Sequence, residues 1–369
     1  MVWGVGLMAK YLIIVKEGTN TDFINEYDVT DVEVHMGIII IAHMSQEVMN
    51  KVSKHENVES IERDGHDTTD AVNTKYTTST TTDAFKFSQA DLFHAEGITG
   101  EGFKVAIMDT GIQPHTNLKV EAGVNAYDSS VSWNSDLVSS HGTQVAGVIN
   151  AQGNNNELLG IAPDAKLYCV RIDDGTGGIN RTTWSSQIAG ISWCVTNKMD
   201  AVNCSFSSEV DSIARKTAFK AAADAGLAIF CSGGNTQESG DTTTQMIPYP
   251  ASYPFTIGNA NITSSKVRYS SSCIGRGLNF ANVATSVKLT TRDTSQTTSS
   301  NYSTGTGTSM AAPANMGMYI LYRQKFGEDR DKTLQRMALN AENLGSFLWY
   351  GAGLPKYPTL NYKNIQVWG

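Results

Sequence analysis

The chain has 369 residues, of which 40% are apolar and 17% charged, a composition typical of a globular protein with one large domain and a small one. Its formal net charge is −8 and its 28 basic residues form no visible patch, so neither a nucleic acid nor an anionic membrane is an expected partner. The apolar start of the chain is interrupted at Lys10. It is too short for a transmembrane helix, and it lacks the basic start and small-residue cleavage site of a standard secretion signal.

The five cysteines indicate a reducing environment. Four of them lie in apolar runs, and none has CxxC or Cys/His metal spacing, so we expect reduced core cysteines and no zinc site. The five are Cys169, Cys194, Cys204, Cys231 and Cys273. Together with the missing secretion signal, they predict a protein made for a reducing compartment such as the cytoplasm.

Residues 9–66 are predicted to form a small first unit. Apolar runs and helix caps alternate here in the order β-α-β-α-β. The expected elements are a strand over residues 11–15, a short helix capped by Asn20 or Thr21, a strand over residues 36–42, a helix from Ser45, and a short strand at Ile61.

Residues 67–83 are rich in threonine and contain very few apolar side chains, which predicts an exposed linker. Exposed polar segments are the usual sites of proteolytic nicking, so we expect a processing site that releases the chain from about residue 84 onward. The alternative is an uncut linker between two domains.

Residues 84–345 alternate apolar strand-like runs with helical segments, which predicts a parallel sheet with helices on both faces. The expected strands are residues 104–108, 166–172, 201–204 and 227–231, and the expected helices are residues 143–150, 185–195 and 214–225. Asp109 and Asn235 follow two of these strands, where such a sheet places its chemistry. The tail, residues 346–369, has no predicted role.

Three short motifs carry an acid, a base and a nucleophile in the order Asp, His, Ser. They are Val-Ala-Ile-Met-Asp-Thr-Gly at residues 105–111, His-Gly-Thr-Gln-Val-Ala-Gly at residues 141–147, and Gly-Thr-Ser-Met-Ala-Ala-Pro at residues 307–313. This is the order found in subtilisin, and it differs from the orders of chymotrypsin and the α/β-hydrolases. With Ser-Gly-Gly-Asn at residues 232–235, the chain resembles the subtilisin-like serine proteases, the subtilases.

The resemblance implies a subtilisin-like α/β fold and a small ferredoxin-like α+β prodomain over residues 9–66, which acts as an inhibitory propeptide. It implies that Ser309 is the nucleophile, His141 the general base, and Asp109 the group that orients the histidine ring. Asn235 and the backbone N–H of Ser309 would stabilise the oxyanion. The implied substrate is a polypeptide, and no cofactor is implied for catalysis.

The resemblance also implies that a peptide substrate binds as an added strand in a cleft. The expected cleft residues are Ser205, Phe206 and Ser207 on one wall, Gly175, Thr176 and Gly177 on the other, and Ser232, Gly233 and Gly234. Ser207 stands where subtilases usually carry glycine, so the specificity of other members does not transfer to this chain. The bond between Tyr249 and Pro250 is expected to be cis, as in the family segment that it resembles.

The loop over residues 152–160 resembles a calcium-binding loop of subtilases. The implied ligands are the carbonyls of Gln152, Asn156 and Leu158 and the side chains of Asn154 and Asn117. The family normally has a carboxylate at the position of Asn117, and fewer carboxylates mean weaker binding. The alternative is a polar loop that hydrogen-bonds internally.

One departure from the family lies on the helix that follows the serine. Subtilases usually carry His-Val-Ala where this chain has Ala314, Asn315 and Met316, and we expect the change to affect packing only.

The leading interpretation is a self-processing serine endopeptidase. Two alternatives remain: a retired protease scaffold that serves as a structural or binding protein, and a protease that acts only on itself or on a co-assembled partner. Labelling with a serine-reactive fluorophosphonate separates the first alternative from the other readings, and turnover of added substrate separates the second.

Overall fold

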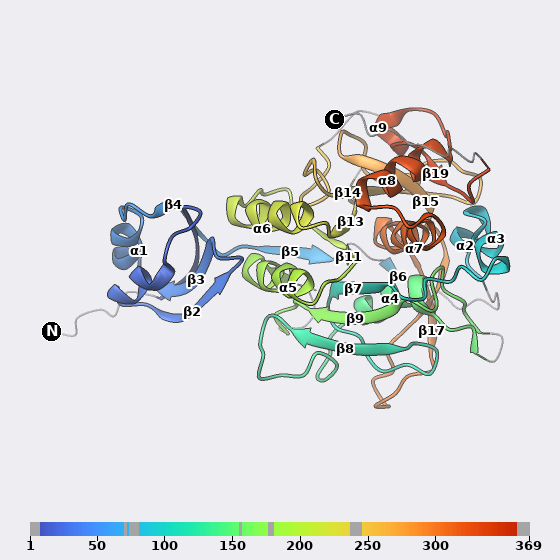
Figure 1. Ribbon diagram of the computed structural model, residues 1–369. Coiled ribbons are helices and arrows are strands. Elements are labelled where there is room, and N and C mark those ends of the chain that lie inside the picture. Colours follow the sequence, from blue (N-terminus) through green and yellow to red (C-terminus); the bar gives the residue numbers. More distant parts are fainter. Residues whose placement is uncertain are drawn as a thin grey trace.

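The computed structural model describes residues 8–69, 72–73, 81–154, 157–175, 181–236 and 246–359, with the backbone alone for residues 66–69 and 72–73. It has a small N-terminal unit beside a larger unit in which helices surround a parallel sheet (Figure 1). This is the fold class predicted from the sequence.

The N-terminal unit is a four-stranded antiparallel sheet in the order β2-β3-β1-β4. Its elements are β1 (Ala9–Val15), η1 (Thr21–Glu26), β2 (Thr30–His35), β3 (Ile39–Met44), α1 (Gln46–Val52) and β4 (Val58–Arg63). Asn20 and Ser45 cap the two helices as predicted, because their side-chain oxygens accept the N–H groups of Asp22 and Val48.

The sequence-based order of this unit is wrong in one respect, because it omits β2. Most of β2 is exposed, so it lacks an apolar face that would reveal it. The turn that follows has positive φ at Met36 and Gly37, 55° and 69°, where the next strand was expected to begin. That strand therefore begins at Ile39, and the observed β-α-β-β-α-β order is the ferredoxin-like one.

The larger unit is built on a seven-stranded parallel sheet in the order β15-β14-β13-β11-β7-β9-β8. The strands are β7 (Lys104–Asp109), β8 (Val120–Asn125), β9 (Lys166–Arg171), β11 (Ala201–Cys204), β13 (Ala228–Ser232), β14 (Ile257–Ile262) and β15 (Leu278–Val283). Along β7, successive side chains belong to different hydrophobic cores. Ala106 and Met108 lie in one core, and Val105 and Ile107 lie in the other. Strands that are apolar on both faces need cover on both faces.

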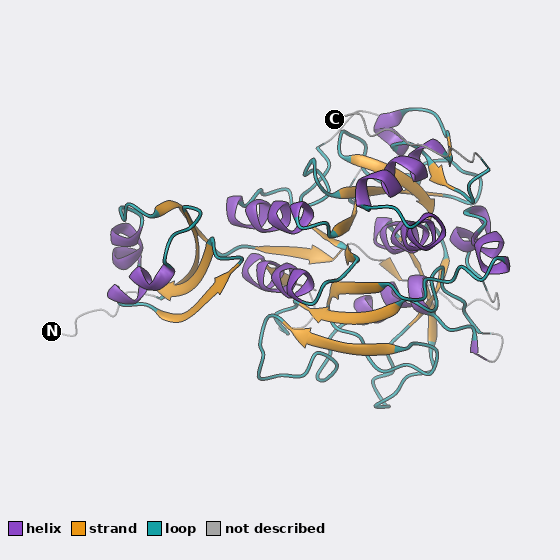
Figure 2. Ribbon diagram, viewed as in Figure 1, coloured by secondary structure: helices purple, strands orange, loops and turns teal. Residues whose placement is uncertain are grey.

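Helices provide that cover on each side of the sheet (Figure 2). On one side lie α5 (Trp184–Thr196) and α6 (Ile213–Asp224), and on the other lie α4 (His141–Asn150) and α7 (Thr308–Phe326). Further helices are α2 (Asp83–Phe87), α3 (Ala90–Ala95), α8 (Arg330–Leu339) and α9 (Phe347–Tyr350).

The N-terminal sheet has two apolar faces, and only one is covered by its own helices. Ile13 and Ile40 pack toward η1 and α1. Leu12, Ile14 and Ile41 belong instead to the core that contains α5 and α6. The two units therefore share a hydrophobic core, which orients them relative to each other.

The described residues also form three short sheets. They are β10 (Arg181–Thr183), β5 (His66–Thr69) and β12 (Phe206–Ser207); β16 (Val287–Thr290), β17 (Tyr302–Thr306) and β6 (Val72–Asn73); and β18 (Ala341–Glu342) with β19 (Leu354–Pro355). The polar composition of residues 67–83 did not predict β5 or β6. Residues 70–71 and 74–80 of that segment lie outside the described residues.

The cysteines form no disulfide: all five are buried free thiols, as expected. Burial raises the pKa of the Cys169 and Cys194 thiols, which keeps them protonated. Within the described residues, no helix has both the length and the apolar character needed to cross a bilayer.

Candidate active site

The candidate site lies where three neighbouring parallel strands end. Because β13, β11 and β7 run in the same direction, their carboxyl ends meet at one edge of the sheet. Asp109 is the last residue of β7, Ser205 follows β11, and Asn235 lies just beyond the end of β13 at Ser232. The fold thus brings three predicted site residues to the same edge.

Asp109 and His141 form a buried pair at this edge. His141 Nδ1 lies 2.8 Å from Asp109 Oδ1 and 2.9 Å from Oδ2, and the two side chains are 2% and 1% exposed. The N–H of Thr110 also donates to Asp109 Oδ1, at 2.7 Å. Because an ionised carboxylate only accepts, Nδ1 carries the proton in this contact and Nε2 is the basic nitrogen of the ring.

A glycine beside the histidine allows the start of α4 to approach β7. The N–H of Gly142 donates to Thr110 Oγ1 at 3.1 Å. A Cβ at Gly142 would lie 2.2 Å from the carbonyl oxygen of Gly111, so no larger residue fits there. The His-Gly pair of the motif therefore places the imidazole against the carboxylate.

Ser309 is the second residue of α7 and is fully buried. Its Oγ has no hydrogen-bond partner among the described residues, although buried hydroxyl groups are normally paired. Its carbonyl accepts the hydroxyl of Ser205 at 2.9 Å. Helix α7 packs against α4, which begins at His141. An unpaired buried hydroxyl at a helix start needs an explanation, and a chemical role provides one.

Asn235 is held by the residue that precedes the serine. Its Oδ1 accepts the backbone N–H of Thr308 at 2.9 Å and the Thr308 hydroxyl at 3.0 Å. The amide oxygen of Asn235 thus faces the start of α7. Gly234 before it has φ +97°, and a Cβ there would lie 2.8 Å from Pro248 and 2.9 Å from Cys273, so this turn requires glycine.

A strand of the chain itself lies where a substrate strand is expected. β5 runs between β10 and β12 with antiparallel pairing on both sides. Thr69 lies opposite Phe206, and Thr68 lies opposite Ser207 and Arg181. These pairings are made by backbone groups. An added strand is therefore bound in much the same way whatever its side chains are.

The structure describes only part of the segment that the resemblance assigns to the second wall of this cleft. The strand that faces β12 across β5 is β10, several residues beyond Gly175. The N–H of Gly175 donates to the carboxylate of Asp173 at 3.3 Å. Thr176 and Gly177 lie outside the described residues.

The chain continues from β5 to the side of the serine. Val72 lies opposite Thr306 and Asn73 opposite Gly305, in antiparallel pairing of β6 with β17. β17 leads directly into α7 and Ser309. Only two residues separate Thr69, between the cleft walls, from Val72, beside the serine-bearing segment.

Two carboxylates of the N-terminal unit bind helix starts of the larger unit, contacts that no sequence motif indicated. Glu62 Oε1 accepts the hydroxyl of Ser212 at 2.5 Å and the N–H of Ala214 at 2.8 Å, at the start of α6. Asp64 accepts the N–H of Ser185 at 2.8 Å and also the Ser185 hydroxyl, at the start of α5. Burial raises the pKa of Asp64. Carboxylates at helix N-termini are stabilising, so these contacts anchor the segment that leads into β5.

Asn117 forms hydrogen bonds with three residues of the loop that was predicted to bind calcium. Its Nδ2 donates to the carbonyl of Leu158 at 2.6 Å, its Oδ1 accepts the N–H of Asn154 at 3.1 Å, and its carbonyl accepts the N–H of Gln152 at 3.0 Å. A donor thus occupies a carbonyl that a cation would need, so these residues do not fit calcium. No cluster of three His, Cys, Asp or Glu side chains suited to a metal occurs in the described part of the chain, and Asn156 lies outside it.

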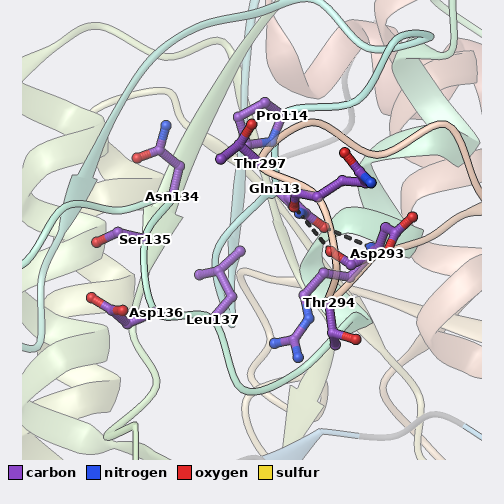
Figure 3. A pocket seen from close by; sticks show the side chains of 11 residues that line it. Gln113, Pro114, Asn134, Ser135, Asp136, Leu137, Asp293, Thr294 and Thr297 are labelled. Atoms are coloured by element: carbon purple, nitrogen blue, oxygen red, sulfur yellow. Dashed lines mark hydrogen bonds between the residues drawn. The ribbon is translucent and has the colours of Figure 1, made fainter.

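A pocket of about 410 Å³ borders the site (Figure 3). Residues 134–137, which precede α4, form one wall. The other wall is formed by Gln113 and Pro114 with residues 292–294, 296 and 297. Gln113 Nε2 donates to the carbonyl of Asp293 at 2.9 Å, and the Asp293 N–H donates to Gln113 Oε1 at 2.8 Å. Most of the second wall lies in the connection from β16 to β17, the strand that pairs with β6 and leads into α7.

The peptide bond between Tyr249 and Pro250 is cis, as predicted from the resemblance. Backbone hydrogen bonds of 2.9 Å in both directions join Tyr249 to Ser208. They place this segment beside β12.

Comparison with known proteins agrees with the motifs. The sequence model of the subtilase family matches residues 100–369. Subtilisin E of Bacillus subtilis (strain 168) is 35% identical over 268 residues, which cover 72% of this chain and 67% of the relative. The subtilisin of Bacillus pumilus is 35% identical over 268 residues, 93% of its own length. A thermostable alkaline protease of Halalkalibacterium halodurans is 31% identical over 350 residues, 94% of this chain and 90% of the relative.

Proposed function

Because the chain belongs to the subtilase family and is a serine endopeptidase that acts on polypeptides, we propose that Asp109, His141 and Ser309 form its catalytic triad. The observation that carries the proposal is the buried contact of 2.8 Å between His141 Nδ1 and Asp109. A histidine fixed in this tautomer presents Nε2 as a base, and the hydroxyl of Ser309 on the adjacent helix is the group for it to activate.

The reaction then follows from these groups. His141 Nε2 takes the proton as Ser309 Oγ attacks the carbonyl carbon of the scissile bond. The imidazolium that forms is stabilised by Asp109, and it gives the proton to the leaving amine when the C–N bond breaks. Water, deprotonated by the same histidine, hydrolyses the acyl-enzyme and regenerates the serine.

Asn235 is proposed to stabilise the oxyanion together with the backbone N–H of Ser309. Its Oδ1 is bound by Thr308, so its Nδ2 is the end that donates to the negative oxygen. Ser309 N lies in the first turn of α7, where N–H groups lack a partner within the helix. Both donors are fixed before the substrate arrives, which is what makes such a site effective.

We propose further that the protein processes itself. The support is the path of the chain from β5, between the cleft walls, to β6 beside β17. A bond between Thr69 and Val72 would be cut, so the sequence-based processing region narrows from residues 67–83 to three peptide bonds.

After the cut, the N-terminal unit is proposed to remain bound as an inhibitor. β5 would keep its pairings with β10 and β12, and the Glu62 and Asp64 contacts with α6 and α5 would persist. Release of this unit would then be the step that frees the cleft for other polypeptides.

The test is the intact mass of purified wild type beside Ser309→Ala, followed over time, with a fluorophosphonate probe added to each. We expect loss of a fragment that ends between Thr69 and Val72, and probe labelling, in wild type only. No cut and no labelling would support the retired scaffold. A cut with labelling but no turnover of added peptides would support a protease that acts only on itself or on a partner.

A further inference from the structure

Four buried polar side chains connect α7 to the strands beneath it. Asn282 Nδ2, on β15, donates to the side-chain oxygen of Asn315, on α7, at 2.8 Å. Asn315 Nδ2 donates in turn to the side-chain oxygen of Asn259, on β14, at 2.8 Å. Asn282 also binds Ser88 Oγ at 3.2 Å. All four residues are fully buried.

The same relay reaches the segment that carries Asn235. Asn259 Nδ2 donates to the carbonyl of Cys231 at 3.0 Å, and the backbone carbonyl of Asn259 accepts the N–H of Gly233 at 2.9 Å. Cys231 and Gly233 lie on either side of Ser232, immediately before Gly234 and Asn235. Asn259 therefore binds this turn at two points.

The nucleophile helix and the oxyanion turn are thus joined at two places. One is the contact of Thr308 with Asn235 at the start of α7. The other is Asn315, six residues after Ser309 and about 9 Å further along the helix axis. α7 also packs against α4 and the sheet. Apolar packing is not directional, whereas hydrogen bonds are, so the two polar connections define the register of α7 more closely than packing alone.

We propose that Asn315 is a positioning residue that holds Ser309 in register with the oxyanion turn, a role that rests on the proposed triad. The expectation that the change from the family's usual valine affects packing only is therefore replaced by a role in site geometry. Both ends of the Asn315 amide are used, Oδ1 by Asn282 and Nδ2 by Asn259, so its orientation is fixed. Buried amides of this kind are tolerated only when paired, which couples their hydrogen bonds to the helix position.

The test compares Asn315→Val with Asn150→Val in the full chain. Asn150 is an equally buried asparagine at the end of α4 that donates to the carbonyls of Pro163 and Ala165, neither of which is part of α7. Thermal unfolding is measured for each variant. The kinetic readouts are the first-order rate of the self-cut between Thr69 and Val72, and kcat and KM on an added peptide.

We expect both variants to lower the melting temperature, and only Asn315→Val to slow the self-cut and kcat, by about tenfold to 100-fold, with KM within twofold. Asn282→Ala, which removes one bond to Asn315, should give an intermediate loss and serves if Asn315→Val does not fold. The double variant Asn259→Val with Asn315→Val should cost little more than the single one, because both act in one relay.

A purely structural role for Asn315 would show as a lower melting temperature with kcat and the self-cut rate within twofold of wild type, and that result overturns the proposal. Wild type that neither cuts itself nor reacts with a fluorophosphonate would instead overturn the proposed function, and the positioning role with it. Wild-type labelling therefore distinguishes the two failures.

Discussion

The hydroxyl of Ser205 donates to the backbone carbonyl of Ser309 at 2.9 Å, and this is the carbonyl that Pro313 leaves without its helical donor. In a regular helix the N–H of residue 313 would bind the carbonyl of residue 309, but proline has no N–H. Asn203 Nδ2 donates to the Ser205 oxygen at 2.9 Å and so fixes the hydroxyl. A residue of the cleft wall thereby supports the backbone of the proposed nucleophile.

We predict that Ser205→Ala lowers kcat by about fivefold, since one such hydrogen bond is worth roughly 1 kcal/mol. Pro313→Ala restores a helical N–H to the same carbonyl, so Ser205→Ala should cost less in that background. Steady-state kinetics on the four members of this double-mutant cycle measure the coupling. Equal losses in the two backgrounds would show that Ser205 does not act through the Ser309 carbonyl.

Replacing the proposed oxyanion donor should affect the chemical step alone. Asn235→Ala is expected to lower kcat by about 10²–10³, the size of loss known for the oxyanion asparagine of a subtilisin, with little change in KM. Thr308→Val removes one of the two groups that bind the Asn235 oxygen and should give a smaller loss. A rise in KM with unchanged kcat would assign Asn235 to substrate binding instead.

Chelation is predicted to leave the stability of the protein unchanged, because Asn117 closes the loop that would otherwise hold calcium. The melting temperature of Ser309→Ala, which cannot cut itself under the proposed mechanism, should be the same in EDTA and in millimolar calcium. Asn117→Asp replaces the donor that faces the Leu158 carbonyl with an oxygen. This variant should melt lower in EDTA and regain stability with calcium, and a calcium-dependent melting temperature in the parent would contradict the prediction.

The stability of the protein is predicted to depend on pH through His115. Burial lowers the pKa of its ring below 6.5, and its Nδ1 accepts the N–H of Asn117 at 3.1 Å, which requires the neutral form at that nitrogen. The unfolded chain therefore binds a proton more readily than the folded one, so stability falls as the pH drops below about 6.5. Urea unfolding of Ser309→Ala at pH 7.5 and pH 5.5 measures the difference. His115→Gln should reduce it, and an unchanged difference would assign the effect to other groups.

The anchoring carboxylates should control how long the cut N-terminal unit stays bound. Glu62→Ala removes charged hydrogen bonds worth about 1.5–3 kcal/mol at the start of α6, so release should be at least tenfold faster. Glu59 is exposed on the same strand, and Glu59→Ala is the matched control. The measurement is the lag between the self-cut and turnover of an added peptide. Equal lags in the two variants would show that the shared apolar core alone sets release.

The alternation of apolar runs and helical segments predicted the parallel sheet, and the motifs predicted residues at its carboxyl edge, because such features are local. Where a strand is followed by aspartate, or a glycine pair by asparagine, the local sequence is enough to predict the local structure. The pairings of β5 and β6 could not be predicted in this way. They are made by backbone groups, so the Thr-rich sequence does not indicate which strands are the partners. No apolar pattern could have revealed them.

Other parts of the site depend on contacts between residues far apart in the chain. The pairing of β10 with β5 is one such contact, and the sequence did not predict it. Asn117 and Asn315 both stand where the family has another residue. The role inferred for each asparagine rests on its hydrogen bonds to distant loops and strands. Its position in the sequence alone could not show those partners.

The two apolar faces of the N-terminal sheet have a consequence for the timing of activity. Leu12, Ile14 and Ile41 are buried only as long as α5 and α6 lie against them. Once this unit leaves, that apolar surface is exposed to water, and a four-stranded sheet that its own helices cover on one face only becomes less stable. The released fragment would then become a substrate of the enzyme that it had inhibited. Activation would therefore be irreversible, and each molecule could be activated only once.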